Sequence, residues 1–360
     1  MKRMYRLIMV LVCVLMVFGF TMPSMAAEYP TMRLKATSWF PAGSFTNDML
    51  EWFVQEIEKR TAGKVTFEKY WGGALLKGGE ALEGLQHGVT DFGVIAPAYT
   101  PGKVPLAYSN YAFPFCPRSA ATMASVVTQI YEEFPWMHDE LTAHNVKLLY
   151  WGTVSDYGLL SRKPVKGLAD MKGLKVVQLG GYFADWTKAS GIIPVSGITS
   201  SERYERLRTG VVDASLLTPS FFVDYKEYEV AKNCIMVGLG ARVPMAMLMN
   251  MNTWKKMSPE LQKLFMDVGK EIQKRHAEET DRKMLKDLEI LQQKGVEYAG
   301  YLSEAEINKW AAEVPDTAAT MCKSLEGKYP DIWKMAHRFI EISAKDGHRW
   351  PRKFAVEGSN

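Results

Sequence analysis

The residues of this sequence that could do chemistry are aromatic and polar side chains that follow short apolar runs. Each aromatic ring offers about 150–250 Å² of surface for burial, and carboxylate, amide, hydroxyl and guanidinium groups can orient a polar ligand. Together they favour non-covalent binding of a small solute with an apolar or aromatic part. The candidate ligand-binding residues are Trp39, Phe40, Ser44, Tyr99, Trp151, Asp156, Tyr157, Gln178, Gly180, Gly181, Thr218, Phe221 and Arg242.

Residue patterns that catalyse reactions or hold metals are not found. The sequence has no H-E-x-x-H, no G-x-S-x-G and no EF-hand loop, which zinc hydrolysis, serine catalysis and calcium binding would require. The histidines show no ligand spacing; they are His87, His138, His144, His276, His337 and His348. We therefore expect no enzyme, no metal and no cofactor. An exported enzyme with an unfamiliar site stays open as an alternative, because paired carboxylates can come from anywhere in a fold.

The elements that would position the candidate residues occur twice in the chain. Residues 83–97 match residues 205–219 in the pattern E-x-L-x-x-G-V-x-D-x-x-[VL]-[IL]-x-P. Each copy is typical of a helix, a glycine that ends it, and a short strand. In open α/β sheets ligands lie beyond the carboxyl ends of the strands. We therefore expect two α/β lobes, with residues 96–99 and 217–221 facing a shared cleft.

The amino terminus has the pattern of a secretory signal peptide. Lys2, Arg3 and Arg6 precede an uncharged run over residues 7–20, and small residues surround a cleavage position after Ala26. This pattern predicts export of the mature protein. The whole chain has a formal net charge of +4, and removing these three basic residues leaves a nearly neutral protein. The charge gives no reason to expect a nucleic-acid partner.

The remaining chain is long enough for two domains. We expect a signal peptide at 1–26, an α/β lobe at 27–150, a second α/β lobe at 151–240, and a return through the hinge into C-terminal helices at 241–360 that brace both lobes. The apolar residues 241–251 indicate a strand that crosses the hinge, and residues 259–293 indicate a long helix. Cys116, Cys234 and Cys322 are widely separated, which favours buried thiols.

The order of these elements, with Lys163-Pro164-Val165, residues 173–176 and residues 204–213, resembles the periplasmic solute-binding subunits of TRAP (tripartite ATP-independent periplasmic) transporters. The likeness runs from about residue 32 to residue 326 and includes Phe113-Pro114-Phe115. It implies a two-lobed venus-flytrap receptor in the periplasm. It also implies that a small organic acid is captured between the lobes and passed to two membrane permease subunits. An ABC-type binding protein stays open as a rival class.

The sequence departs from the family where the ligand's carboxylate is usually held. The resemblance places an arginine at position 177, where this chain has Val177 with Gln178 beside it. A second family arginine is replaced by Asp156, and Ser215 stands where metal-assisted members carry a glutamate. A guanidinium is suited to carboxylates because it offers a two-pronged donor. Another cation is therefore needed, and Arg242 or Arg162 are candidates.

These departures leave two ligand classes open. An aromatic or apolar-substituted organic acid is the main expectation. An aromatic amino acid or other amine is the alternative, because a buried Asp156 carboxylate would need a cation or a hydroxyl as its partner. The state of association is open between a monomer and a homodimer, since the apolar stripe over residues 333–342 would serve a dimer interface or a bracing helix equally well.

Overall fold

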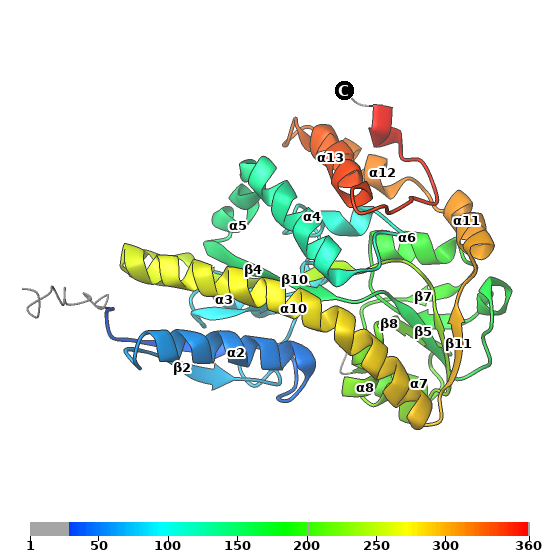
Figure 1. Cartoon of the computed structure of the whole chain (residues 1–360), viewed down its shortest axis with the longest axis horizontal. Helices are drawn as coiled ribbons and strands as arrows, with labels where there is room; N and C mark the ends of the chain where they lie inside the picture. Colours follow the sequence, from blue (N-terminus) through cyan, green and yellow to red (C-terminus); the bar gives the residue numbers. More distant parts are fainter. Residues whose placement is uncertain (1–28, 200–201, 359–360) are drawn as a thin grey trace, which may run out of the picture.

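Two β-sheets lie side by side, each with helices packed on it, and form the two lobes of the molecule (Figure 1). The computed structural model describes residues 29–199 and 202–358, so the predicted signal peptide and its cleavage after Ala26 lie outside the described residues. The arrangement confirms the two-lobed α/β fold class.

The first sheet has five strands in the order β2-β1-β3-β10-β4. β1 pairs in parallel with β2 and β3, and β10 runs antiparallel between β3 and β4. A strand from late in the sequence thus completes the first lobe, as expected for a chain that returns through the hinge. The strands are β1 (Met32–Thr37), β2 (Val65–Tyr70), β3 (Phe92–Ile95), β4 (Val146–Val154) and β10 (Arg242–Asn250).

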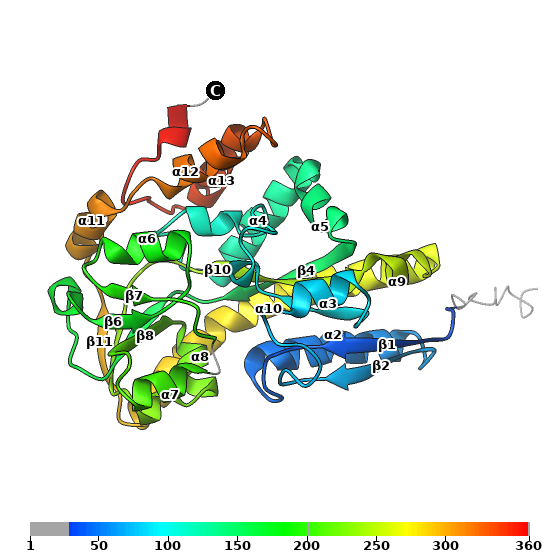
Figure 2. The same ribbon diagram turned by 180° about the vertical axis from the view of Figure 1, so that it is seen from behind.

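The second sheet has six strands in the order β11-β9-β5-β8-β6-β7. β6 pairs in parallel with β7 and β8, whereas β5 runs antiparallel between β8 and β9. Figure 2 shows this sheet from behind, with α6 and α7 beside it. The strands are β5 (Gly158–Ser161), β6 (Lys175–Val177), β7 (Ile193–Val195), β8 (Ala214–Leu217), β9 (Asn233–Met236) and β11 (Glu297–Tyr301).

The helices cover the sheets and join the lobes. Over residues 29–199 and 202–358, no helix has the length and apolar character needed to cross a lipid bilayer. The helices are α2 (Phe45–Arg60), α3 (Ala81–Gln86), α4 (Ala120–Glu133), α5 (Asp139–Ala143), α6 (Tyr182–Lys188), α7 (Arg203–Arg208), α8 (Pro219–Asp224), α9 (Met251–Lys255), α10 (Pro259–Gln293), α11 (Glu304–Glu313), α12 (Thr317–Leu325) and α13 (Ile332–Ala344).

The repeated sequence pattern builds the same local structure in both lobes. The glycines that follow α3 and α7, Gly88 and Gly210, have φ values of +73° and +75°, a region in which a side chain would be strained. They end the two helices so that the chain can turn into β3 and β8. Both copies lie where the sequence predicted a helix, a stop and a strand.

The repeated aspartates hold neighbouring strands in register. The amide of Lys35 donates to Asp91 at 2.8 Å, and the amide of Lys175 donates to Asp213 at 3.0 Å. The backbone returns each contact, since the amides of Asp91 and Asp213 donate to the carbonyls of the same lysines. Asp91 therefore fixes β3 beside β1, and Asp213 fixes β8 beside β6.

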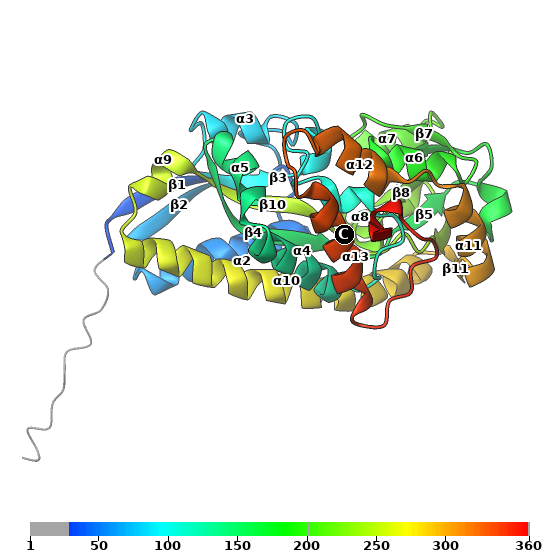
Figure 3. The same cartoon turned by 90° about the horizontal axis from the view of Figure 1, so that it is seen from above.

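The chain crosses between the lobes from β4 to β5, from β9 to β10, and again along α10, which leads from α9 to β11. The predicted boundary between residues 150 and 151 falls inside β4, which pairs with β10 as far as Val154. The crossing into the second lobe thus begins after Val154. The long helix α10 is capped by Ser258, with Pro259 in its first turn, and packs on α2, α4 and β4 of the first lobe and on α8 of the second (Figure 3).

The C-terminal helices brace both lobes. The Thr317 hydroxyl accepts a hydrogen bond from the indole of Trp186 in the second lobe at 3.0 Å and donates to the carbonyl of Ala112 in the first at 2.7 Å. Phe339 of α13 stacks on Phe113 with ring centroids 4.3 Å apart. The apolar stripe of α13 is therefore largely buried within its own chain. Cys116, Cys234 and Cys322 are free and buried.

Candidate ligand-binding site

A pocket lies between the lobes, at the carboxyl ends of β3 and β8 and beside the crossing strands. Its free volume is about 40 Å³, room for only a few water molecules. A solute with an aromatic ring needs more space, so its entry requires the lining side chains to move apart. The lining residues are Trp39, Phe40, Ala96, Ala98, Tyr99, Tyr111, Val154, Tyr157, Leu179, Leu217, Phe221, Pro244 and Met245.

Aromatic rings form most of the walls, and some of them meet across the cleft. The rings of Trp39 and Tyr99 in the first lobe lie 5.9 Å apart. Phe40 meets Phe221 of the second lobe edge to face at 6.0 Å. Tyr99 from the first repeat and Phe221 from the end of the second line the same pocket, at the cleft that the sequence predicted.

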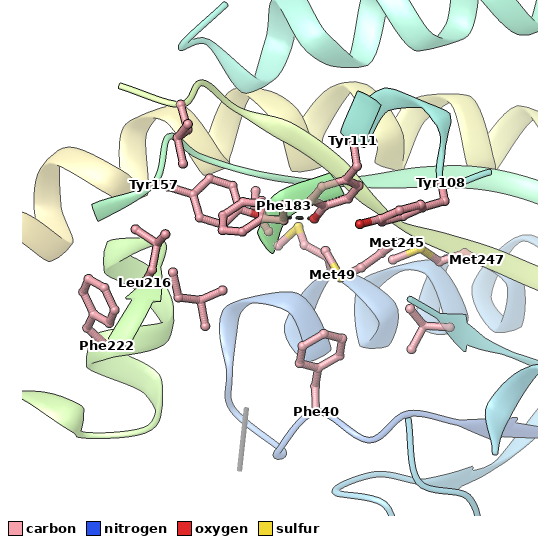
Figure 4. Packing of buried hydrophobic residues seen from close by; sticks show 14 of the residues in the cluster. Phe40, Met49, Tyr108, Tyr111, Tyr157, Phe183, Leu216, Phe222, Met245 and Met247 are labelled. Carbon is pink, nitrogen blue, oxygen red and sulfur yellow. Dashed lines mark hydrogen bonds between the residues drawn. The ribbon is translucent and has the colours of Figure 1, made fainter. Parts of the chain in front are cut away.

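Two tyrosines mark the inner end of the pocket. Their hydroxyls, those of Tyr111 and Tyr157, lie 3.0 Å apart and share a hydrogen bond. Figure 4 shows the two side chains pointing toward each other, with Phe40 on the side of the first lobe. Burial raises the pKa of both phenols, so each remains a neutral group that can donate or accept a hydrogen bond.

Five of the sequence-predicted residues line this pocket: Trp39, Phe40, Tyr99, Tyr157 and Phe221. Ala96, Ala98 and Leu217 also line it and lie within the ranges 96–99 and 217–221 that were expected at the cleft. Sequence reasoning missed Tyr111, Val154, Leu179, Pro244 and Met245. A signal for Tyr111 existed, because it lies two residues before the Phe113-Pro114-Phe115 segment on which the family resemblance partly depends.

Three predicted polar anchors lie outside the lining and serve the fold. The Ser44 hydroxyl donates to the carbonyl of Pro41 at 2.7 Å, where α2 begins. The Gln178 side-chain oxygen accepts a hydrogen bond from the Thr187 hydroxyl at 3.2 Å. Thr218 is buried at the start of α8, one residue beyond the pocket residue Leu217. The structure thus places these groups near the cleft without directing them into the pocket.

Trp151 and the glycine pair also lie outside the lining. Trp151 packs edge to face on Tyr131 at 5.1 Å in the core of the first lobe. The carbonyl of Gly180 accepts a hydrogen bond from Tyr108 at 2.9 Å, and Gly181, with φ of +62°, stands against the same phenol. The glycines therefore close a contact between the lobes.

Asp156 is fully buried and uses its carboxylate within the hinge. One oxygen accepts hydrogen bonds from the amides of Tyr157 and Gly240, both at 2.7 Å. The other lies 3.7 Å from the guanidinium of Arg118. Burial raises the pKa of Asp156 to about 6, against the smaller opposing effects of Arg118 and the two amides. The carboxylate is therefore held by the protein itself.

Arg242 is also fully buried, and it donates hydrogen bonds to backbone carbonyl groups. It donates to the carbonyls of Phe113 at 3.0 Å and Leu239 at 2.8 Å, and it lies 5.1 Å above the ring of Trp186. Arg162 is exposed. Neither of the two arginines considered from the sequence lines the pocket.

The structure reveals another buried cation, Arg203, at the start of α7. Its Nη1 donates to the carbonyls of Val177 at 3.1 Å and Leu216 at 3.3 Å and to the hydroxyl of Ser215 at 3.0 Å. Arg203 was not among the sequence candidates. The signal was present in the repeat, because the equivalent position of the first copy is the buried residue Ala81.

Within the part of the chain that the structure describes, no group of three or more histidine, cysteine, aspartate or glutamate side chains could hold a metal ion. The fold and the site define the class of the protein. Two lobes, segments that cross a hinge, and an aromatic pocket between the lobes are the features of a solute receptor of the venus-flytrap class.

Comparisons with known proteins establish the family. Residues 36–324 match the model of the bacterial extracellular solute-binding proteins, family 7 (DctP). The chain belongs to this family and is the solute-binding subunit of a TRAP transporter, as the sequence resemblance implied. It is a receptor and not an enzyme, and its family functions outside the cytoplasm. Capture of a small solute and delivery to a membrane permease follow from this role.

The proteins similar to this chain include receptors for different acids. A solute-binding protein of Albidiferax ferrireducens is 27% identical, over 81% of this chain and 86% of its own length. A marine metagenome TRAP solute-binding protein specific for aromatic acids, in complex with 3-hydroxybenzoate, has a TM-score of 0.79 at 20% identity, covering 89% of this chain and 100% of its own. The Bordetella pertussis receptor DctP7, which binds pyroglutamic acid, has a TM-score of 0.73 at 20% identity, covering 87% and 100%.

Proposed function

We propose that this receptor captures a small aromatic or apolar-substituted organic acid in the pocket between its lobes and delivers it to a TRAP permease in the periplasm. The observation that carries the proposal is the aromatic lining, in which Trp39, Tyr99 and Phe221 converge with Tyr111 and Tyr157. The aromatic-acid receptor with the similar fold supports the same ligand class.

The energetics fit a ring with an anionic group. Burying roughly 150 Å² of ring stabilises a complex by about 4 kcal/mol at ~25 cal/mol/Å². Micromolar affinity needs about 8 kcal/mol, and association itself has an unfavourable entropy. The ring alone is therefore insufficient. The paired hydroxyls of Tyr111 and Tyr157 offer polar contacts, and a carboxylate would need a cation in addition.

The alternative ligand class, an amine, depended on the carboxylate of Asp156 as its binding partner. Asp156, on which it depended, lies outside the pocket lining, and its carboxylate is held by two amides and Arg118. An ammonium in the pocket would therefore lack an unengaged carboxylate among the residues that line it. We propose the acid and treat the amine as the outcome that would contradict it.

A thermal-shift screen of the mature protein tests the proposal. The probes are 3-hydroxybenzoate, its neutral analogue 3-hydroxybenzyl alcohol, its cationic analogue 3-hydroxybenzylamine, and the non-aromatic acid pyroglutamate. A ligand at 100 times its dissociation constant adds about 2.7 kcal/mol of stability. We expect the largest shift with 3-hydroxybenzoate. A larger shift with the amine or with pyroglutamate would overturn the proposed ligand class.

A further inference from the structure

Arg203 carries a buried positive charge without a carboxylate partner. Its side chain is 1% exposed, and it forms no ion pair with any described residue. Nη1 makes all three of its hydrogen bonds, Nε is buried without a partner, and Nη2 has no hydrogen bond within the described residues. Burying an unpaired charge costs several kcal/mol. The three acceptors of Nη1 therefore compensate only part of this cost.

The guanidinium is not among the side chains that line the pocket, but it lies next to the pocket wall that the second lobe provides, so a ligand reaches it only when the lining side chains move apart. It bonds the carbonyls of Val177, the last residue of β6, and Leu216 of β8. Leu179, two residues after Val177, and Leu217, the residue after Leu216, line the pocket. The lining phenols of Tyr99 and Tyr157 are close enough to act on the charge of Arg203.

The carboxyl group that acts on the charge of Arg203 is that of Glu227, and it does not neutralise this charge fully. Glu227, in the short 3-10 helix η6 (Glu227–Glu229), is completely buried, and neither of its oxygens has a hydrogen-bond partner among the described residues. Burial raises the pKa of Glu227 to about 7, against smaller opposing effects of Arg203 and Ser215. Near neutral pH part of the population therefore has a protonated Glu227 beside a charged arginine.

We infer that Arg203 holds the carboxylate of the ligand, through the donors that the fold leaves without partners. The cation then lies on α7 and not on β6. Its guanidinium donates a hydrogen bond to the carbonyl of Val177, the position at which the family resemblance places an arginine. The inference rests on the proposed function and specifies it: the ligand is an anion whose charged group points to the second lobe, while its ring lies among the aromatic residues of the pocket.

A carboxylate beside Arg203 also affects the proton on Glu227. A second negative charge within the cluster disfavours an ionised Glu227, so binding near pH 7 takes up a fraction of a proton. The other ionisable groups that act on Arg203 are the phenols of Tyr99, Tyr157 and Tyr225, and burial raises the pKa of Tyr157 and Tyr225. Proton uptake by this cluster therefore reports on Glu227.

Calorimetry with 3-hydroxybenzoate and 3-hydroxybenzyl alcohol tests the role of Arg203. We expect Arg203→Gln to weaken binding of the acid about 30-fold, the effect of losing a charge-assisted contact, and to change binding of the alcohol less than threefold. Arg203→Lys should restore part of the affinity for the acid. Arg206→Gln, an exposed position on the same helix, is the matched control and should leave both affinities unchanged.

Proton uptake gives a second readout that does not depend on folding of the Arg203 variants. Titrations of the wild type with 3-hydroxybenzoate in buffers of different ionisation enthalpy should show uptake near pH 7. Glu227→Gln should abolish the uptake and bind the acid at least as tightly. Absence of uptake in the wild type, or a tenfold loss of affinity in Glu227→Gln, would overturn the inference.

The two proposals fail differently. A wild-type protein that binds 3-hydroxybenzylamine or pyroglutamate more tightly than 3-hydroxybenzoate overturns the proposed ligand class. A wild-type protein that binds 3-hydroxybenzoate, together with a folded Arg203→Gln variant of equal affinity for it, leaves the proposed function in place and overturns the role of Arg203.

Discussion

The carboxylate of Asp156 and the amide of Gly240 are joined by a hydrogen bond of 2.7 Å across the hinge. Asp156 lies on the crossing from β4 to β5, and Gly240 lies on the crossing from β9 to β10. The bond therefore ties together two of the segments that connect the lobes. It gives Asp156, at a position where the family resemblance implies an arginine, a role in the hinge.

Removing this carboxylate should destabilise the hinge without changing the ligand class. In Asp156→Ala the amides of Tyr157 and Gly240 lose their acceptor, and each unpaired buried amide costs about 1–3 kcal/mol. Asp156→Asn keeps an oxygen at the same place and should lose less. Urea denaturation of both variants measures the effect. Equal stability of the alanine variant and the wild type would show that the bond does not support the fold.

The raised pKa of Asp156 predicts a pH dependence of definite sign. The folded value is about 6, above the reference value of 3.8, so protonation favours the folded state. This contribution is fully present below about pH 4 and is lost as the pH rises through 6, amounting to about 3 kcal/mol. The free energy of unfolding of the wild type relative to Asp156→Asn should therefore fall between pH 4 and pH 7. A constant difference would contradict this.

Gly240 should tolerate no side chain. It has a φ of +88°, and a Cβ atom built there would lie 2.1 Å from the carbonyl oxygen of Cys116. Gly240→Ala should cost more than 3 kcal/mol, because it adds a backbone clash to the strain of the left-handed conformation. Gly295→Ala is the control, since Gly295 has a φ of +79° with open space around it. Thermal denaturation should show a much smaller loss for the control.

Phe221 should contribute to affinity more than to stability. It faces Phe40 from the opposite lobe, so Phe221→Ala removes a ring from the pocket wall, and we expect at least a tenfold loss in affinity for 3-hydroxybenzoate. Val223→Ala, on the same helix but outside the lining, should leave the affinity unchanged. Calorimetry compares the two, and equal losses would place the ligand elsewhere.

The buried His276 should make the protein less stable in acid. Desolvation lowers its pKa to about 4 from the reference value of 6.5, so the folded state disfavours the proton. The stability is present above pH 6.5 and is lost as the pH falls through 4, by about 3 kcal/mol. His276→Leu should have a weaker dependence on pH over this range. An unchanged slope in urea titrations would assign the acid sensitivity to other groups.

The sequence predicted the repeats because their signals are local. Gly88 and Gly210 each end a helix, and the apolar runs after them form β3 and β8 at the edge of the cleft. These signals place Tyr99 and Phe221 at the pocket without knowledge of any long-range contact.

The wrong and missing predictions of pocket residues depend on the direction in which a side chain points, which the sequence does not determine. Trp151 and Val154 both lie on β4, but the side chains of a strand alternate between its faces. Val154 lines the pocket, whereas Trp151 packs into the core of the first lobe. Arg203 was missed because helix α7 otherwise presents exposed charges, and its burial arises only when α7 packs beside β6 and β8.

The continuous helix α10 has a mechanical consequence. Its 35 residues extend for about 50 Å, and it is attached to α2 in one lobe and to α8 in the other. Separation of the lobes must therefore bend this rod or make α8 slide along it. Bending stores elastic energy and sliding does not, so the stiffness of a helix outside the pocket helps to set the amplitude and the axis of the opening motion.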